Sequence, residues 1–341
     1  MRYYIEETNN HEQHAGTKAR QDVCDILADQ CWKPLTVRKR FGGNTLDKFM
    51  AMPDVYSDWR KVAKIVTSND TVLIQYPINT YPRVAPFALP AIRKMKQRGA
   101  KIIMLIHDLE RLRTHSDVSE TKFFALADVV ICHNDTMKAI LQTYYPHMKI
   151  VSLGIFDYLT NEPTYPSNER HGIDIAGNLT PDKSAYVYSL AERFPEADFH
   201  LYGPNFNASA PESKWYEGSF APEKLPSVLC GKFGLVWDGD STTTCNGPNG
   251  EYLRINNPHK LSLYLASKEP VIIWDQAAEA PFVRDNNLGI IAPSIADAIE
   301  QMNAMTEDEY EAITESVHTV CAQLRSGHYL TAAVDKALEL L

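Results

Sequence analysis

The residues with the clearest chemical potential stand just before a buried strand in the last third of the chain. Residues 259–266 have the pattern of a short helix, and residues 270–274 have the pattern of a parallel-type strand. His259 and Lys260 then lie in the first turn of the helix, where free N–H groups and the helix dipole attract anions. The segment predicts an anion site, although the same pattern also fits a helix–strand unit of any doubly wound domain.

The start of this helix has residues that suit a cap. Asn256 and Asn257 are good capping residues, and Pro258 suits the first turn, where its missing N–H is not needed. We therefore expect an asparagine cap at this helix, with Pro258 in the first turn.

A second candidate site follows a hydrophobic strand predicted at residues 101–106. This strand ends in His107 and Asp108. A carboxylate or imidazole at the carboxyl end of a parallel strand can take a proton from an attacking hydroxyl group. The structural alternative is a hydrogen-bonded core histidine followed by an aspartate that caps the next turn.

Two turns that contain glycine precede helices and suit a phosphate group or a sugar hydroxyl. In the first turn, Gly16 permits close backbone approach, and Thr17 suits the cap of a helix that begins at Lys18. In the second turn, Gly177 and Asn178 close a strand, and a helix that carries Lys183 follows.

Aromatic and acidic residues stand at the ends of two further strands of the second half and beside one helix start. Tyr202 ends a strand, and Phe220 stands beside a helix start, where it suits stacking on a base or local packing. Asp238 and Asp240 could bind a cation, but without a third carboxylate at suitable spacing an ordinary loop explains them better.

Short β-rich runs alternate with helical patterns along the whole chain, which predicts parallel sheets. The predicted strands are residues 3–5, 35–38, 71–75, 101–106, 129–132, 150–153, 173–175, 199–202, 233–237, 271–274 and 289–291. The predicted helices are residues 18–29, 46–66, 86–97, 135–144, 183–193, 222–229, 259–266, 295–303, 307–324 and 329–341. Two successive halves of roughly 150 residues predict two Rossmann-like domains.

Composition restricts the class of protein. The 341 residues are 44% hydrophobic and 23% charged, as in soluble globular proteins, and a net charge of −9 argues against a broad nucleic-acid surface. The N-terminus lacks the apolar core of a signal peptide, and no apolar run approaches the roughly 20 residues of a membrane span. The six cysteines show no C-x-x-C pair and no Cys/His spacing typical of zinc sites, so we expect a cytoplasmic protein without structural disulfides or structural zinc.

Four segments, in this order along the chain, resemble a bacterial glycosyltransferase family. They are Gly16-Thr17-Lys18-Ala19-Arg20, Ile106-His107-Asp108, Gly177-Asn178 and Asn257-Pro258-His259-Lys260-Leu261. The family comprises galactofuranosyltransferases of surface-polysaccharide pathways and the related glucosyltransferases that extend glycans on streptococcal adhesins. The resemblance covers nearly the whole chain and is strongest over residues 233–291.

The resemblance implies an α/β fold of the GT-B class, in which two Rossmann-like domains face each other across a cleft. It implies an acceptor-side domain over residues 1–156 and a nucleotide-sugar-binding domain over residues 157–325. The last helix, residues 326–341, is then expected to pack back on the first domain.

The resemblance also implies the reaction: transfer of a hexosyl group, galactofuranose or glucose, from a UDP-sugar to a glycan or a lipid-linked oligosaccharide, with no metal or other cofactor. Lys183 and Lys260 would neutralise the diphosphate, and Phe220 would stack on the uracil. Gly16 and Thr17 would approach the donor from the opposite domain. The other residues expected at the donor site are Gly177, Asn178, Tyr202, Asn257 and His259.

One departure from the commonest retaining GT-B enzymes bears on the mechanism. Many of those enzymes carry a pair of glutamates before the final strand, whereas the helix here, residues 259–265, contains none. This favours an inverting transfer, which needs a base on the acceptor side. We expect Asp108 to be that base, with His107 orienting it or substituting for it.

Two other functions are compatible with the sequence. A nucleotide-sugar epimerase can share this architecture, with Asp238, Asp240 and Glu251 as candidate acid/base groups. A non-catalytic nucleotide-sugar-binding partner of another transferase is the non-enzyme alternative. The basic clusters at residues 38–40 and 93–98 suit peripheral contact with the inner face of the membrane as well as an ordinary solvated surface. The family resemblance alone suggests a homo-oligomer.

Overall fold

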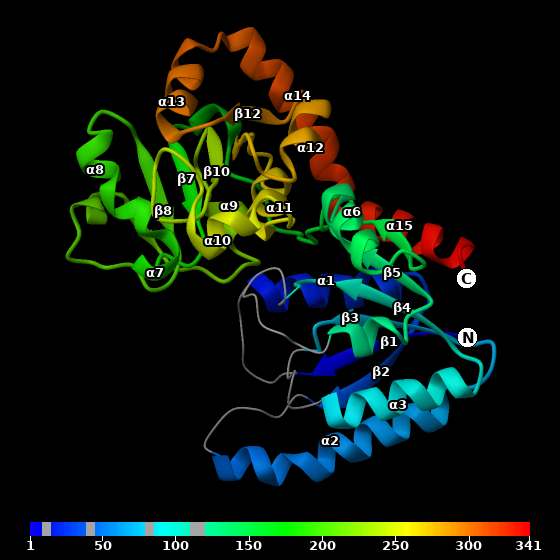
Figure 1. The fold of residues 1–341 in the computed structure, drawn as a ribbon. Helices are drawn as coiled ribbons and strands as arrows, with labels where there is room; N and C mark the ends of the chain where they lie inside the picture. The colour runs from blue at the N-terminus through cyan, green and yellow to red at the C-terminus, as the bar shows by residue number, and fades with distance from the viewer. Residues whose placement is uncertain (9–14, 39–44, 79–84, 110–119) are drawn as a thin grey trace. The chain divides into compact units, whose positions relative to one another are not determined.

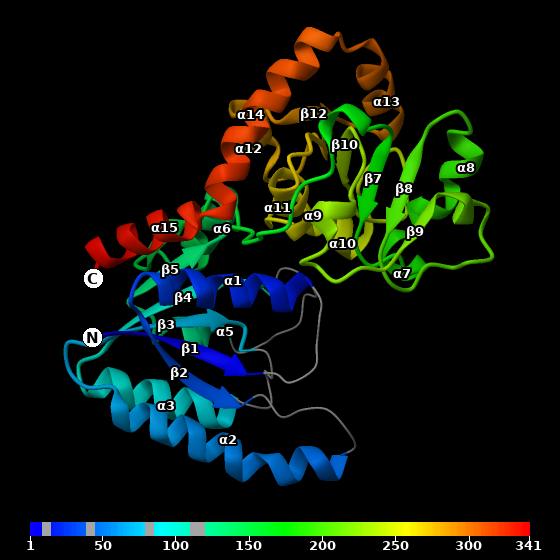
Figure 2. The same cartoon turned by 180° about the vertical axis from the view of Figure 1, so that it is seen from behind.

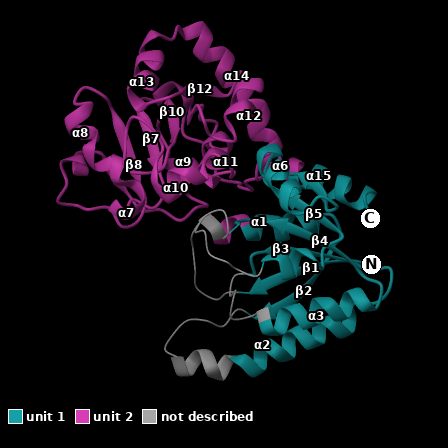
Figure 3. Cartoon of the chain, in the orientation of Figure 1, with its two compact units in different colours: residues 1–12, 20–153, 330–341 teal, residues 13–19, 154–329 magenta. Residues whose placement is uncertain are grey.

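The structure is a computed structural model that describes residues 1–8, 15–38, 45–78, 85–109 and 120–341. The chain forms two compact units, shown in two colours in Figure 3. Unit 1 contains residues 1–12, 20–153 and 330–341, and unit 2 contains residues 13–19 and 154–329. Each unit is therefore completed by a segment from a distant part of the sequence.

Unit 1 is built on a six-stranded sheet with the strand order β2-β1-β3-β4-β5-β6, in which neighbouring strands pair in parallel. Its strands are β1 (Arg2–Thr8), β2 (Lys33–Arg38), β3 (Thr71–Tyr76), β4 (Lys101–Ile106), β5 (Val129–Cys132) and β6 (Lys149–Ser152). Its helices are α1 (Ala15–Asp29), α2 (Thr45–Ile65), α3 (Ala85–Gln97), α5 (Glu120–Phe124), α6 (Asp135–Tyr144) and α15 (His328–Glu339). Helices α2 and α3 lie side by side on one face of the sheet and α1 lies on the other (Figures 1 and 2), which explains the nearly continuous apolar sequences of β4 and β5.

Unit 2 has a second six-stranded parallel sheet, in the order β12-β11-β10-β7-β8-β9. Its strands are β7 (Ile173–Ala176), β8 (Phe199–Tyr202), β9 (Tyr216–Gly218), β10 (Phe233–Val236), β11 (Val271–Trp274) and β12 (Gly289–Ala292). Its helices are α7 (Pro181–Ser184), α8 (Leu190–Arg193), α9 (Leu225–Val228), α10 (Gly247–Tyr252), α11 (His259–Ala266), α12 (Ala280–Asp285), α13 (Ile295–Ala304) and α14 (Glu307–Arg325), with short 3₁₀ turns at η1 (Ser167–Glu169), η2 (Ala185–Ser189) and η3 (Pro211–Trp215). Among the described residues, no helix has both the length and the hydropathy of a membrane span.

The strand order in each sheet reverses next to the first strand of that sheet. In unit 1 this happens between β1 and β3, and in unit 2 between β7 and β10. Ligands of open α/β sheets bind at the carboxyl ends of the strands that meet at such a point, because the connections leave in opposite directions there. These two places are where functional side chains are expected.

The predicted pair of parallel α/β sheets is confirmed, and several elements match residue for residue, among them β4, β5, β8, β11, α6 and α11. The single helix predicted over residues 183–193 is wrong, since the segment is divided into α7, η2 and α8. Tyr186 explains the interruption: its backbone N–H donates to the carbonyl oxygen of Gly239 (3.4 Å) and its hydroxyl lies 3.5 Å from the carbonyl oxygen of Trp237. These tertiary bonds replace regular helical ones.

The predicted caps of two helices are wrong. Pro258 is the N-cap of α11 (φ −72°, ψ 130°) and not part of its first turn, and no side chain caps the helix. The amide of Asn257 donates instead to the carbonyl oxygen of Gly154 at 2.8 Å. Helix α1 begins at Ala15, so Thr17 lies inside its first turn and does not precede it.

Candidate functional site

Helix α11 is fixed on the unit 2 sheet by Tyr264. The ring lies so close to β10 that a Cβ atom on Gly234 would be 2.1 Å from it, and its hydroxyl accepts a hydrogen bond from the N–H of Ala176 at 2.7 Å. Lys260 precedes Tyr264 by one helical turn and therefore shares its face of the helix. The packing of Tyr264 thus directs Lys260 toward the carboxyl ends of β7 and β10.

The ammonium group of Lys260 is held at the carboxyl end of β10. Its Nζ donates to the carbonyl oxygen of Trp237 at 2.7 Å and to Oδ1 of Asp238 at 2.9 Å. The Lys260 and Asp238 side chains are 14% and 10% exposed. Two of the three ammonium protons have partners among the described residues, so one is available to an anionic ligand.

A glycine turn lies beside this cation, at the ends of β7 and β8. The N–H of Gly177 donates to the carbonyl oxygen of Tyr202 at 2.9 Å. A Cβ atom on Gly203 would lie 1.7 Å from the carbonyl oxygen of Gly177, whereas a Cβ atom on Gly177 would meet none of the described atoms within 4 Å. The turn therefore needs glycine at position 203 and has open space next to Gly177. The exposed Asn178 follows, and its Oδ1 accepts hydrogen bonds from the Thr180 N–H (3.1 Å) and from the Asn205 amide (3.0 Å).

Lys183 belongs to the same region. Its carbonyl oxygen accepts a hydrogen bond from the N–H of Gly239 at 3.4 Å, which joins α7 to the segment that follows β10. The structure therefore brings Gly177, Lys183 and Lys260 to one edge of the sheet, at the point where the strand order reverses.

His259, the residue before Lys260, is largely packed. Its ring stacks on Phe156 with centroids 4.9 Å apart and planes 28° apart. Burial, with a smaller contribution from the positive charge of Lys18, lowers the pKa of His259 to about 4. The imidazole is therefore neutral near pH 7 and cannot add positive charge to the site.

The first turn of α1, which contains Gly16 and Thr17, groups with unit 2. The next residue, Lys18, donates from Nζ to the carbonyl oxygen of Leu159 at 2.6 Å and lies 4.7 Å above the ring of Tyr158. Lys18 thus attaches this turn to the segment that opens unit 2, in the electrostatic neighbourhood of His259.

The two predicted aromatic residues occupy different environments. Phe220 is 39% exposed, and its ring lies 6.2 Å from the ring of Tyr202. Tyr202 is buried, and its hydroxyl lies 3.2 Å from the carbonyl oxygen of Val228. Phe220 presents a face on which a planar ligand can stack, and Tyr202 supports it from the core.

In unit 1, His107 and Asp108 follow β4 directly. Nε2 of His107 lies 2.7 Å from Oε1 of Gln75, whose own Nε2 donates to the Arg20 carbonyl oxygen (3.3 Å) and to Sγ of Cys24 (3.4 Å). Because both donor bonds fix the amide nitrogen of Gln75 away from the histidine, the amide oxygen accepts a proton from Nε2 of His107. The acceptor nitrogen of the neutral imidazole is then Nδ1.

Sequence reasoning did not find two other polar groups at this edge, Glu7 near the end of β1 and Gln75 near the end of β3. Glu7 lies 3.7 Å from the guanidinium of Arg20, which also donates to the carbonyl oxygen of Pro77. Asp108 and Glu7 both act electrostatically on Arg20. Strands β1, β3 and β4 are neighbours, so their ends gather Glu7, Gln75, His107 and Asp108. The only signal in the sequence was the presence of polar residues near the end of each strand.

Comparison with known proteins gives relatives over the whole chain. The family models described as "Glucosyltransferase 3-like" match at residues 2–155 for the N-terminal domain and 173–337 for the C-terminal domain. The β-1,6-galactofuranosyltransferase WbbI of Escherichia coli (strain K12) is 33% identical over 351 residues, which cover 99% of this chain and 98% of that protein. Glucosyltransferase 3 of Streptococcus gordonii is 25% identical, with 89% of this chain and 91% of that protein covered.

Solved structures share the fold at low sequence identity. An alpha-glucosyltransferase in complex with UDP superposes with a TM-score of 0.65 at 14% identity, covering 100% of this chain and 99% of that one. WaaG, a glycosyltransferase involved in lipopolysaccharide biosynthesis, does so with a TM-score of 0.53 at 10% identity and 99% coverage of both chains. The predicted GT-B fold is therefore confirmed. With relatives of this kind along its whole length, the chain belongs to the glucosyltransferase 3-like family and is a glycosyltransferase.

Proposed function

We propose that this glycosyltransferase moves a hexosyl group from a UDP-sugar to a hydroxyl group of a glycan or a lipid-linked oligosaccharide. The observation that carries the proposal is the ammonium group of Lys260, held at the carboxyl end of β10 beside the open Gly177 turn. The activity named for the E. coli relative favours galactofuranose as the transferred sugar. Glucose, named for the streptococcal relatives, is the alternative.

In the proposed donor complex the diphosphate lies against positive groups of unit 2. Lys260, Lys183 and the N-terminus of α11 face the phosphate charge, and the space next to Gly177 admits a phosphate oxygen. Phe220 stacks on the uracil. These groups stabilise the leaving UDP as the glycosidic bond breaks, so we propose that the transfer needs no metal ion and no other cofactor.

On the acceptor side, Asp108 takes the proton of the attacking hydroxyl group. His107 has its Nε2–H engaged by Gln75, so Nδ1 is the nitrogen that can orient Asp108 or accept the proton in its place. Attack from the face opposite the UDP inverts the configuration of the anomeric carbon. The helix that contains Lys260 has no glutamate, which agrees with an inverting transfer.

Calorimetric titration with UDP, UDP-glucose, UDP-galactopyranose and UDP-galactofuranose, with EDTA present, tests the donor site. We expect UDP to bind with micromolar affinity, and Lys260→Ala to weaken binding about tenfold or more because it removes a charge-assisted contact. Lys214→Ala, which removes an exposed lysine elsewhere in unit 2, is the matched control. The donor assignment fails if no uridine nucleotide binds.

A product assay separates the transferase from the two alternatives. Incubation of the preferred UDP-sugar with a glycan acceptor is expected to give a glycosylated product and free UDP. Interconversion of UDP-sugars without acceptor would instead indicate an epimerase, and binding without turnover would indicate a non-catalytic partner.

We also propose that the enzyme is cytoplasmic and forms a homo-oligomer. It would contact the membrane peripherally when its acceptor is lipid-linked. Arg93 and Lys94 are exposed on α3 and suit anionic headgroups, whereas Arg38 is engaged by Asp54 and Asp58. Sedimentation with phosphatidylglycerol vesicles, compared with phosphatidylcholine vesicles, tests the membrane contact. Light scattering measures the mass of the particle in solution.

A further inference from the structure

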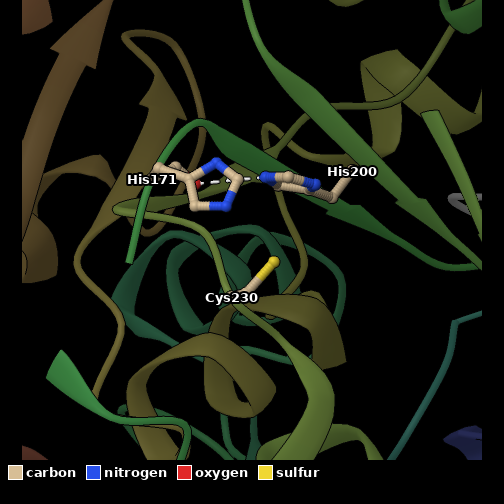
Figure 4. Close-up of side chains that lie close together, drawn as sticks. All are labelled: His171, His200 and Cys230. Atoms are coloured by element: carbon tan, nitrogen blue, oxygen red, sulfur yellow. Dashed lines mark hydrogen bonds between the residues drawn. The ribbon is translucent and has the colours of Figure 1, made fainter. Parts of the chain in front are cut away.

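His171, His200 and Cys230 form a cluster at the amino-terminal edge of the unit 2 sheet (Figure 4). One nitrogen of each histidine and the Cys230 sulfur all lie within 4.8 Å of one another. The three residues stand at the starts of β7, β8 and β10, which are neighbours in the sheet. At about 3.3 Å per residue, four-residue strands separate this edge from the carboxyl edge by roughly 13 Å. The cluster therefore lies at the opposite edge of the sheet from the groups assigned to the diphosphate.

The backbone that carries the cluster is held in place. Arg170 donates from Nη1 to the carbonyl oxygen of Gly231 (3.0 Å) and from Nη2 to that of Ser267 (2.7 Å). The N–H of His171 donates to the carbonyl oxygen of Cys230 at 3.0 Å. One main-chain hydrogen bond and the Arg170 side chain thus position His171 and Cys230, so less conformational entropy is lost when a ligand binds.

Each histidine has a carboxylate beside its Nδ1 atom. Nδ1 of His171 lies 2.6 Å from Oδ2 of Asp198, and Nδ1 of His200 lies 3.7 Å from Oε1 of Glu217. Histidine ligands of metals usually donate their second N–H to a carboxylate, which fixes the ring and strengthens the other nitrogen as a ligand. Glu217 beside Nδ1 of His200 leaves Nε2 as the metal-binding nitrogen of that ring, and this Nε2 also lies 3.7 Å from Oδ2 of Asp198. Nε2 of His200 now lies 3.2 Å from the carbonyl oxygen of His171, a contact that a metal ion would replace.

We propose that His171, His200 and Cys230 bind one divalent transition-metal ion, and that the ion is Zn²⁺. Two imidazoles and a thiolate match the ligand preference of Zn²⁺, whereas Mg²⁺ and Ca²⁺ prefer oxygen. Ligand bonds of about 2.0 Å to nitrogen and 2.3 Å to sulfur place the ligand atoms roughly 3.5 Å apart, so the three groups close by about 1 Å. The side chain of His171 is 59% exposed and has room to move, and a water molecule completes the tetrahedron. Binding displaces the thiol proton of Cys230 to solvent.

The ion would have a structural role and not a catalytic one. It would join the starts of three strands whose other ends carry residues of the donor site. The hydroxyl of Tyr202 lies 3.3 Å from the Cys230 sulfur and connects the cluster to the core of unit 2. We therefore expect Zn²⁺ to raise the melting temperature of the protein.

Competition for Zn²⁺ against a chromophoric chelator tests the site. The purified full chain is expected to bind one equivalent, and His171→Ala and Cys230→Ser are each expected to weaken binding about tenfold or more. The controls are His147→Ala and Cys31→Gly, which change exposed residues outside the cluster and should bind as the wild type does. With Co²⁺ in place of Zn²⁺, the wild type should show a thiolate-to-cobalt charge-transfer band that Cys230→Ser lacks.

The proposal is overturned if the wild type does not compete for Zn²⁺, or if His171→Ala binds the ion as tightly as the wild type. Because the His171 side chain is exposed, we expect the variant to fold as the wild type does, and circular dichroism checks this. UDP titration of His171→Ala separates a failure of the Zn²⁺ proposal from a failure of the proposed donor site. If His171→Ala loses Zn²⁺ binding and still binds UDP, the Zn²⁺ site is supported independently of the donor sugar.

Discussion

At the scale of single residues, His259 shows how its surroundings determine the charge of a side chain. It stands in the first turn of α11, where a cation would suit an anion site, yet its ring is stacked on Phe156 and close enough to Lys18 to be influenced by its charge. Both effects disfavour the imidazolium form. In the proposed donor complex, the positive charge near the diphosphate therefore comes from Lys260 and Lys183.

The lowered pKa of His259 predicts a pH dependence of stability. The unfolded chain takes up a proton on this histidine near its usual pKa of about 6.5, and the folded chain does so only near a pKa of about 4. Protonation therefore favours unfolding as the pH falls from 6.5 to 4. We expect the wild type to lose on the order of 2 kcal/mol more stability than His259→Gln between pH 7 and pH 4.

Urea unfolding at pH 7, 5 and 4 measures this difference. His147→Gln, at an exposed histidine, should keep the pH dependence of the wild type. If His259→Gln shows the same pH dependence as the wild type, His259 does not titrate as described.

The base of the proposed reaction can be identified by comparing three variants at the unit 1 edge. Asp108→Asn is expected to lower kcat about 10²–10⁴-fold, since loss of a general base has effects of that size, with UDP affinity unchanged. His107→Gln should lower kcat less and shift the pH profile, because Asp108 still accepts the proton. Glu7→Gln is the comparison: Glu7 is engaged by Arg20, and a larger loss in Glu7→Gln than in Asp108→Asn would transfer the role of base to Glu7.

At the scale of elements, the turns after β7 and β8 offer a matched pair of substitutions. Gly203→Ala would place a Cβ atom 1.7 Å from the Gly177 carbonyl oxygen. The Cβ atom of Gly177→Ala would enter open space, so the only cost is the backbone strain of an alanine at a φ of +150°. We expect Gly203→Ala to cost about 3 kcal/mol or more and to abolish UDP binding, and Gly177→Ala to cost about 1–2 kcal/mol. Thermal unfolding and UDP titration of both variants give the test, and equal effects would contradict the proposed geometry.

The regular elements were largely predictable because their periodicity is local. The apolar strand β4 and the amphipathic helix α6 each carry enough pattern within the segment to define both ends. Short elements lack such a pattern. Strand β9 has three residues and helices α10 and α12 have six each, so tertiary contacts determine their conformation. The segment from α7 to α8 is the clearest case, since its hydrogen bonds to Gly239 and Trp237 come from the segment that follows β10, about 50 positions away.

The candidate sites were predictable to the extent that their residues are adjacent in sequence. His107 and Asp108, or His259 and Lys260, follow one another and stand at element ends. Whether Tyr202 is exposed was not predictable, because strand alternation does not show which face of a doubly covered sheet a ligand meets. The cluster of His171, His200 and Cys230 gave no signal, since about 30 residues separate each ligand from the next and only the parallel sheet brings them together.

At the scale of the whole molecule, each unit depends on a segment that lies far away in the sequence. Residues 330–341 belong to unit 1, although the chain before them, residues 154–329, forms unit 2. Gln30 donates to the hydroxyl of Thr331 (2.5 Å), and Lys149 donates to the carbonyl oxygen of Leu340. Unit 1 therefore cannot be completed until residues 330–341 have been synthesised.

This dependence predicts that a buried charge in the last helix weakens unit 1 and spares unit 2. Val334 is fully buried in α15, so Val334→Asp places a carboxylate among apolar side chains and is expected to cost about 3 kcal/mol or more. The unit 1 transition in thermal unfolding should move to lower temperature, while UDP still raises the transition of unit 2 by binding its folded form. Lys336→Asp, an exposed change of charge two positions later, is the control and should leave both transitions near their wild-type temperatures. A single transition that Val334→Asp lowers and UDP raises would show instead that the two units unfold together.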